Sequence, residues 1–176
     1  NTADRLVNIL TITDAIMLER VKSSMSLLKL RADALGVPNQ GDYVSVKNTQ
    51  ARQVRLGSAP QANSFDLVDS LTEVMGGTAT IFSKTGDDYI RISTNVIKNG
   101  ERAIGTKLAP NGKAIKKINQ QQAYYGAVDI LGSPYLTGYE PMFNDAGEVI
   151  GIWYVGYSAD LQVLEQAIKQ SHVLKE

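Results

Sequence analysis

Apolar residues recur every three or four positions over residues 2–35, which is the spacing of one face of an α-helix. They fall at Leu6, Leu10, Met17, Val21, Leu28 and Leu35. No proline or glycine interrupts this segment, and Gly36 followed by Pro38 supplies a stop signal. The predicted helix is about 50 Å long at 1.5 Å per residue, longer than a small domain is wide. We expect it to project from the domain and pair with a second copy; the alternative is a helix bent around its own domain.

From Gly41 the apolar period changes from the helical spacing to the two-residue alternation of β-strands. The first half of this region predicts a hairpin of residues 43–48 and 51–57 turning at Asn48 and Thr49, a loop over 57–64, a helix over 65–75 capped by Ser64, and a hairpin of residues 78–84 and 89–96. The second half predicts a loop over 98–110, a short helix over 111–121, strands over 124–131, 134–143 and 148–158, and a closing helix over 158–176.

Tight turns join the last three predicted strands, so these strands form an antiparallel meander. Together with the preceding hairpin they predict an α+β fold, with a PAS-like five-stranded antiparallel sheet, a long N-terminal helix and a closing C-terminal helix. We divide the chain into the long helix (1–36), the sensor-like domain (37–157) and the C-terminal helix (158–176).

Composition and charge exclude several classes of function. The chain has 176 residues, 43% of them hydrophobic, and its 18 basic and 18 acidic residues give zero net charge, so we expect no nucleic-acid surface. It has no cysteine, and its only histidine is His172, close to the C-terminus. Thiolate, zinc and Ser-His-Asp chemistry are therefore not expected. Neither a P-loop nor a Rossmann fingerprint is present. We expect no catalytic residues, no metal site and no cofactor.

The chain contains no hydrophobic run of the length that spans a bilayer and no visible signal peptide. It begins and ends inside helical patterns. We therefore expect a soluble piece of a longer chain; the alternative is a protein that is soluble as a whole.

Arg91 is the first candidate binding residue. It lies between Ile90 and Ile92, and strict alternation would place it on one face with Ser93. A guanidinium in a central strand is costly to desolvate without an anion to meet. One interpretation is a salt bridge or an exposed sheet face. The other is a cavity wall where Arg91 holds a carboxylate in a bidentate manner, with a hydroxyl donor from Ser93.

The stretch "YLTGYEPM" over residues 135–142 places Tyr135, Thr137 and Tyr139 on one face of a strand and Glu140 on the other. Tyr139 and Thr137 are further candidate ligand contacts, as is Tyr125 on the preceding strand. A cation, hydroxyl groups and aromatic walls without a general base suit the holding of a small anion better than its conversion.

Six motifs resemble one known family when taken together. They are "GG-x-AT-x-F" from Gly76, "R-x-STN" from Arg91, "GT-x-L" from Gly105, "Y-x-G-x-x-x-I-x-G" from Tyr124, "Y-x-T-x-Y-x-P" from Tyr135 and "GI-x-Y-V-G" from Gly151. Over residues 43–157 the chain resembles the Cache sensor domains of bacterial transmembrane receptors, in particular the single-Cache, Cache-3/Cache-2 fusion type of methyl-accepting chemotaxis proteins.

This resemblance implies a periplasmic domain of an inner-membrane receptor that forms a homodimer through its long helix. It also implies a cavity over the sheet for a small organic acid such as acetate, propionate or pyruvate. Arg91, Ser93 and Tyr139 would line that cavity, Thr106, Lys107 and Tyr125 are further candidates, and the loop over 101–110 would cover it.

Three alternatives remain open from the sequence. The same fold serves as the sensor of a histidine kinase or a diguanylate cyclase. A small cytosolic α+β enzyme acting on a carboxylic acid is a candidate from another class. The third alternative is a domain whose cavity is filled and which binds only a partner protein.

Overall fold

The structure is a computed structural model that describes residues 2–159, without the side chains of residues 3 and 6–13. The predicted closing helix and His172 therefore lie outside the described residues. Within the described part, no helix is both long enough and apolar enough to cross a membrane.

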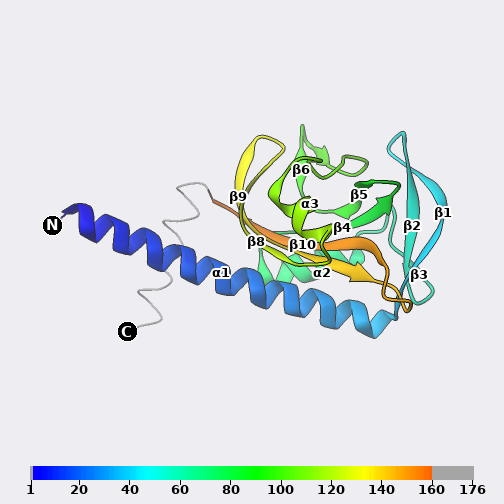
Figure 1. Cartoon of the computed structure of the whole chain (residues 1–176), viewed down its shortest axis with the longest axis horizontal. Coiled ribbons are helices and arrows are strands. Elements are labelled where there is room, and N and C mark those ends of the chain that lie inside the picture. Colours follow the sequence, from blue (N-terminus) through cyan, green and yellow to red (C-terminus); the bar gives the residue numbers. More distant parts are fainter. Residues whose placement is uncertain (1, 160–176) are drawn as a thin grey trace.

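The predicted long helix is α1 (Thr2–Leu35), a single uninterrupted helix. Among its described side chains, the buried apolar ones follow the predicted three-to-four spacing, and they are Met17, Val21, Met25, Leu28 and Ala32. Leu35, predicted to be part of this stripe, is 47% exposed instead. Figure 1 shows that only the C-terminal part of α1 lies along the sheet, while its N-terminal part extends beyond the domain.

The predicted five-stranded antiparallel sheet is present, and its strand order is β5-β4-β10-β9-β8. The strands are β4 (Thr78–Thr85), β5 (Asp88–Thr94), β8 (Tyr124–Ile130), β9 (Ser133–Phe143) and β10 (Val149–Ser158). The last strand of the chain thus occupies the centre of the sheet, between the first hairpin and the meander. This arrangement confirms the predicted PAS-like α+β fold.

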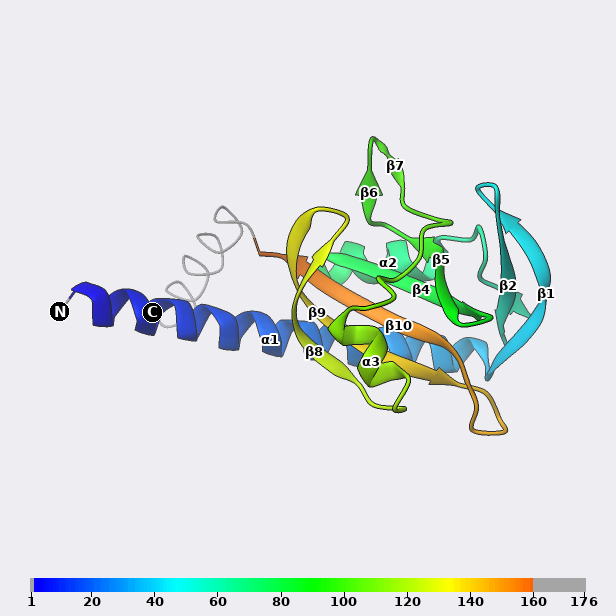
Figure 2. The same ribbon diagram turned by 45° about the horizontal axis from the view of Figure 1, so that its top comes forward.

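Two layers cover the two faces of this sheet (Figure 2). On one face pack α1 and α2 (Asp66–Met75), over a core that includes Leu71, Ile81 and Trp153. On the other face lie α3 (Lys113–Ile118) and the preceding loop, over a core that includes Phe82, Tyr139 and Ile152. We call the side covered by α1 and α2 the helix face of the sheet, and the side covered by α3 the cavity face. The absence of a side chain at Gly138 lets α1 approach closely, since a Cβ there would lie 3.0 Å from Val21.

A smaller sheet lies at one end of the domain and contains β1 (Pro38–Val46), β2 (Thr49–Leu56) and β3 (Ala59–Pro60). Its hairpin turns at Lys47 and Asn48, one residue earlier than predicted, with both residues at positive φ. This matches the type I′ turn that a right-twisted hairpin favours.

Two local predictions are wrong. The N-cap of α2 is Phe65 without a side-chain cap, not Ser64. The predicted loop over 98–110 begins with a small hairpin, β6 (Ile97–Lys98) and β7 (Glu101–Arg102). After this hairpin the chain returns to the edge of β5, where Thr106 and Tyr89 accept backbone hydrogen bonds from Arg91 and Leu108.

Candidate functional site

Arg91 lies on the cavity face of the sheet. A β-bulge in β5 separates it from Ser93, which lies on the other face. Phe82 pairs with Arg91, but its neighbour Ile81 pairs with Ser93, so Ile92 is an extra residue in the ladder. Because a bulge breaks the two-residue alternation, Ser93 turns to the helix face with Ile81. The prediction that Arg91 and Ser93 share one face of the sheet is therefore wrong.

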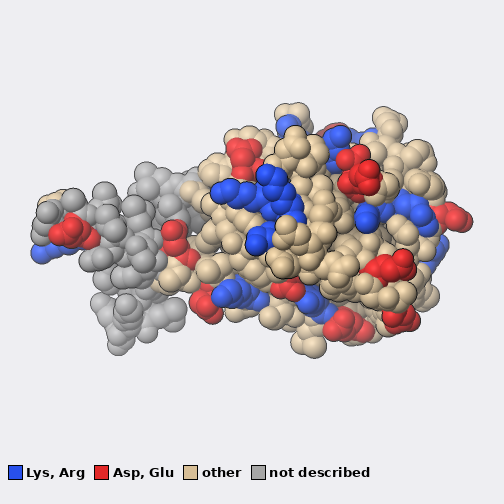
Figure 3. All heavy atoms as spheres, in the orientation of Figure 1, with Lys and Arg blue, Asp and Glu red and all other residues tan. Residues whose placement is uncertain are grey.

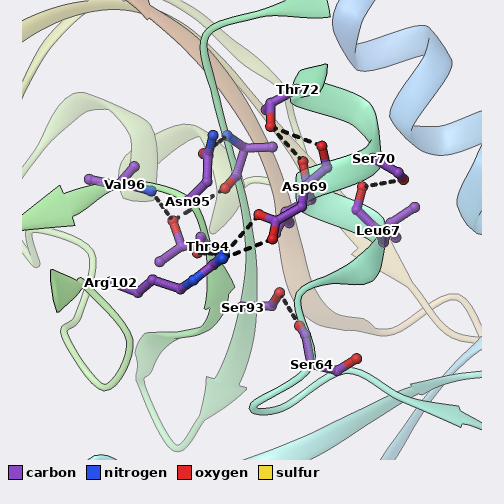
Figure 4. A network of polar contacts seen from close by, with 12 residues as sticks. Ser64, Leu67, Asp69, Ser70, Thr72, Ser93, Thr94, Asn95, Val96 and Arg102 are labelled. Carbon is purple, nitrogen blue, oxygen red and sulfur yellow. Dashed lines mark hydrogen bonds and ion pairs between the residues drawn. The ribbon is translucent and has the colours of Figure 1, made fainter. Parts of the chain in front are cut away.

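Ser93 has a structural partner instead of a cavity position. Its hydroxyl donates a hydrogen bond to the backbone carbonyl of Ser64, in the loop before α2 (Figure 4). The side chain is fully buried there. This contact ties β5 to the loop that precedes α2.

The guanidinium of Arg91 is almost completely buried, with the residue 4% exposed. Its Nη1 donates to Oγ1 of Thr106 and to the carbonyl of Lys107, both at 3.1 Å. Its Cζ lies 5.0 Å from the centre of the Phe82 ring, a favourable cation–π contact. Burial lowers the pKa of Arg91, while the nearby Tyr139 and Tyr154 oppose this shift.

Two donor atoms of Arg91 have no protein acceptor. Among the described residues, Nε and Nη2 make no hydrogen bond and the guanidinium forms no salt bridge. Every fully buried side-chain nitrogen or oxygen in the described part does have a partner. Nε and Nη2 are therefore not fully buried, and Arg91 lines the cavity described next.

This cavity has a volume of about 500 Å³ and lies between β8, β9 and the segment that leads into α3. Its polar and charged lining residues are Arg91, Lys107, Lys113, Asp129 and Tyr139. Its larger apolar lining residues are Leu108, Ala114, Val128, Ile130 and Leu131. The structure thus brings together three of the predicted site residues, Arg91, Lys107 and Tyr139.

Tyr139 forms part of the cavity floor, within an aromatic cluster. Its ring centre lies 5.0 Å from that of Tyr154 and 6.3 Å from those of Phe82 and Tyr124. Burial raises the pKa of the Tyr139 hydroxyl, although Arg91 opposes the shift, so the group stays protonated at neutral pH. It has no hydrogen-bond partner among the described residues, which leaves it available as a donor.

Tyr125 lies on the helix face, so its predicted place in the cavity is wrong. Its hydroxyl donates to Oε2 of Glu140, whose Oε1 accepts from Nζ of Lys29 on α1 at 2.8 Å. Burial raises the pKa of Tyr125, and so does the bond to Glu140. The expectation that Glu140 points away from the Tyr139 side is confirmed.

Thr137 and Thr106 are close to the cavity but do not line it. Thr137 shares the cavity face with Tyr139, and its hydroxyl donates to the carbonyl of Gly126 at 2.7 Å. Thr106 donates to the carbonyl of Ala103 and accepts from Arg91. Thr106 therefore orients the guanidinium.

The loop that forms one cavity wall is held to α2 by an ion pair. Nη1 and Nη2 of Arg102 each donate to one carboxylate oxygen of Asp69 at 2.8 Å, and Nη1 also reaches the carbonyl of Thr94 at 3.1 Å (Figure 4). The guanidinium also stacks on Phe65, with Cζ 4.1 Å from the ring centre. This bidentate pair fixes the start of the segment that carries Thr106 and Lys107.

The surroundings of the cavity are basic. Figure 3 shows lysine and arginine side chains gathered over α3, which carries Lys113, Lys116 and Lys117. Three basic lining residues, Arg91, Lys107 and Lys113, outnumber the one acidic lining residue, Asp129, whose carboxylate accepts the N–H of Gly132 at 2.9 Å. Such a site attracts anions.

Sequence reasoning missed Lys113, Leu108 and Leu131, which complete the cavity. One signal for Leu131 was available: it precedes Gly132 in a two-residue hairpin turn, where asparagine or glycine is the usual choice. Among the described residues, no group of three or more His, Cys, Asp or Glu side chains is placed to hold a metal ion.

Comparison with solved structures gives distant similarities. The ligand-binding domain of the Pseudomonas aeruginosa PAO1 amino acid chemoreceptor PctC, in complex with GABA, is 15% identical, with a TM-score of 0.49, covering 95% of this chain and 67% of that one. The Escherichia coli DcuS sensor domain is also 15% identical, with a TM-score of 0.45, covering 58% and 70%. The ligand-binding domain of the Campylobacter jejuni chemoreceptor Tlp3, in complex with L-valine, is 9% identical, with a TM-score of 0.45, covering 95% and 63%.

No curated protein matches the chain by sequence. The family comparison, in contrast, covers every residue. Residues 1–176 match the model of the Cache 3/Cache 2 fusion domain, so this chain belongs to that family of sensor domains.

Proposed function

We propose that this chain is the extracytoplasmic ligand-sensing domain of a transmembrane chemoreceptor, that it binds a small organic carboxylate in the cavity beside Arg91, and that it passes the signal on through its flanking helices. The single observation that carries the ligand class is the buried guanidinium of Arg91, whose Nε and Nη2 open onto the cavity without a carboxylate partner among the described residues.

The energetics of a buried cation support an anionic ligand. Removing an unpaired guanidinium from water is expensive unless an anion and hydrogen bonds replace the lost hydration. A carboxylate accepts the Nε and Nη2 donors in a bidentate manner, and the Tyr139 hydroxyl is placed to add a third bond. An ammonium ligand would gain nothing from these donors.

Strand β9 of the central sheet connects the cavity to the long helix α1. Tyr139 on the cavity face is followed by Glu140 on the helix face, and Glu140 is paired to Lys29 of α1. A ligand shifts an equilibrium only if it binds two states with different affinity. Movement of β9 on binding would supply that difference, because β9 contacts both the ligand and α1.

This proposal includes a homodimer through the exposed side of α1 and membrane anchors outside the chain. The sensors of histidine kinases and diguanylate cyclases would use the same input domain, and the full-length protein distinguishes these outputs. The binding experiment below applies equally to all three.

The test is a calorimetric titration of the purified domain with small carboxylates, from acetate upward. We expect saturable binding, and at a ligand concentration one hundred times Kd the free energy of unfolding should rise by about 2.7 kcal/mol. Arg91→Ala should abolish binding while circular dichroism shows a folded domain. Arg55→Ala, at an exposed arginine on β2, is the matched control and should bind normally. Equal affinity in the Arg91→Ala and control variants contradicts the proposal.

A further inference from the structure

The cavity is larger than a two- or three-carbon acid requires. Its volume of about 500 Å³ lies within the range of about 300–1,000 Å³ that holds drug-sized ligands. One non-hydrogen atom with its share of space needs about 30 Å³, as a water molecule does in the liquid. Acetate or pyruvate would occupy the polar end near Arg91 and leave most of the volume unfilled.

The space beyond Arg91 is lined by hydrocarbon. Leu108 lines it from the segment that leads into α3, Ala114 lines it from α3 itself, and Val128 and Ile130 line it from β8. Ala114 and Ile130 are also buried in the cavity-face core, so these walls are fixed by packing. Apolar walls stabilise an apolar ligand group, and the charged side chains of Lys107, Lys113 and Asp129 line other parts of the cavity.

Leu131 adds an independent observation. It lines the cavity from the turn between β8 and β9, and its φ is +52°. This left-handed conformation is strained for a bulky residue and suits the asparagine or glycine that such turns prefer. The Leu131 side chain packs against the cavity-face core and lines the cavity, which gives an apolar residue a role at this position.

We propose that the ligand is an amphipathic monocarboxylate whose apolar tail has roughly four to eight carbons. At about 30 Å³ per non-hydrogen atom, such an acid occupies roughly half of the cavity of about 500 Å³. This inference rests on the proposed carboxylate-binding function. The carboxylate meets Nε and Nη2 of Arg91 at the buried end. The tail runs along Leu108, Ala114 and Leu131 toward the opening, where the aliphatic stem of Lys113 can cover it.

The first test is a series of straight-chain acids, acetate, butanoate, hexanoate and octanoate, titrated by calorimetry at one pH and salt concentration. Each buried methylene should tighten Kd about fourfold. Hexanoate should thus bind on the order of a hundredfold more tightly than acetate, and hexan-1-ol, which lacks the charge, should bind far more weakly than hexanoate. Acetate and hexanoate binding within threefold of each other would overturn the inference and leave carboxylate sensing intact. Absence of binding by every acid overturns both.

Two variants locate the tail. Leu131→Asn keeps a residue that suits the turn but removes the hydrocarbon, and Ala114→Leu fills the cavity from α3. Both should weaken hexanoate binding at least tenfold while acetate affinity changes less than threefold. The matched control is Val74→Asn, which removes an apolar side chain that is 62% exposed on α2. Circular dichroism and the retained acetate affinity establish that each variant is folded. Unchanged hexanoate affinity in both cavity variants overturns the assignment.

Discussion

Tyr139 and Glu140 are neighbours on β9 that face opposite sides of the central sheet. Tyr139 lines the cavity beside Arg91, whereas Glu140 accepts hydrogen bonds from Lys29 of α1 and from Tyr125 of β8. A single peptide bond therefore separates a residue of the cavity floor from a residue that is ion-paired to the long helix. We expect a displacement of β9 at the cavity to reach α1 through this pair.

The first prediction is that Glu140→Gln uncouples α1 from the cavity without changing the cavity itself. In the native domain, a saturating carboxylate should slow amide hydrogen exchange in α1 around Lys29. In Glu140→Gln the same carboxylate should bind with an affinity within about threefold of native, because the substitution lies on the other face of the sheet. The exchange response in α1 should then be lost.

Lys29→Ala should reproduce the loss of response, since it removes the other half of the pair. Glu148→Gln is the control, because Glu148 is exposed and its side chain bonds only to Asn144 within the described part of the chain. A full exchange response in the Glu140→Gln variant contradicts this route.

The second prediction concerns acid stability. Burial alone would raise the pKa of Glu140, but the hydrogen bonds from Lys29 and Tyr125 outweigh it and hold the pKa below its ordinary value of 4.5. A carboxyl group whose pKa is lowered on folding stabilises the fold above the unfolded-state pKa and loses this contribution as the pH falls. The free energy of unfolding should therefore decrease below about pH 4.5.

Urea denaturation at roughly one-unit intervals between about pH 3 and pH 7 measures how the free energy of unfolding depends on pH. This spacing resolves the titration of a single carboxyl group. Glu140→Gln should flatten the acid limb of the curve. Glu148→Gln, at an exposed carboxylate whose side chain bonds only to Asn144 within the described part of the chain, should leave the limb as it is in the native domain. An acid limb of equal slope in the native and Glu140→Gln domains contradicts the assignment.

Most of the fold follows from the sequence for identifiable reasons. Alternating residues and tight turns, such as the one predicted at Gly132 and Ser133, leave an antiparallel meander as the only short connection of the three predicted strands over 124–158. The structure places this turn one residue earlier, at Leu131 and Gly132. The spacing of Met17, Val21 and Leu28 in α1 needs no long-range information. Arg91 could be identified because a charged residue between two isoleucines is unusual in a central strand.

The side of the sheet that each candidate faces was harder to predict. Alternation shows which residues share a face, but one inserted residue reverses every assignment beyond it. The bulge at Ile92 does this to Ser93, and the sequence around it carries no glycine or proline to announce it. No local sequence pattern places Tyr125 on the helix face, because its hydrogen-bond partner, Glu140, lies on another strand.

The third prediction tests this correction at Ser93. Ser93→Ala removes a buried hydrogen bond to the carbonyl of Ser64, and it should lower the free energy of unfolding by about 1–3 kcal/mol. Carboxylate affinity should stay within about threefold of native, since Ser93 lies on the helix face. Urea denaturation and calorimetry on the same preparation separate the two effects. A large loss of affinity with unchanged stability would return Ser93 to the cavity.

The fourth prediction assigns Thr106 a positioning role. Its hydroxyl accepts from Nη1 of Arg91 at 3.1 Å and donates to the carbonyl of Ala103, so it holds the guanidinium with Nε and Nη2 toward the cavity. Thr106→Val keeps the shape of the side chain but removes the acceptor. The loss of a hydrogen bond to a charged group costs about 1.5–3 kcal/mol, which corresponds to a carboxylate affinity weakened roughly tenfold to a hundredfold.

Thr106→Ser restores the hydroxyl and should restore the affinity, which a purely steric role of the threonine methyl group would not predict. Thr137→Val is the matched control on the cavity face, because its hydroxyl bonds to Gly126 and not to Arg91. It should lower stability with little change in affinity. If Thr106→Val binds carboxylates as tightly as the native domain, then Phe82 and the carbonyl of Lys107 are sufficient to orient Arg91.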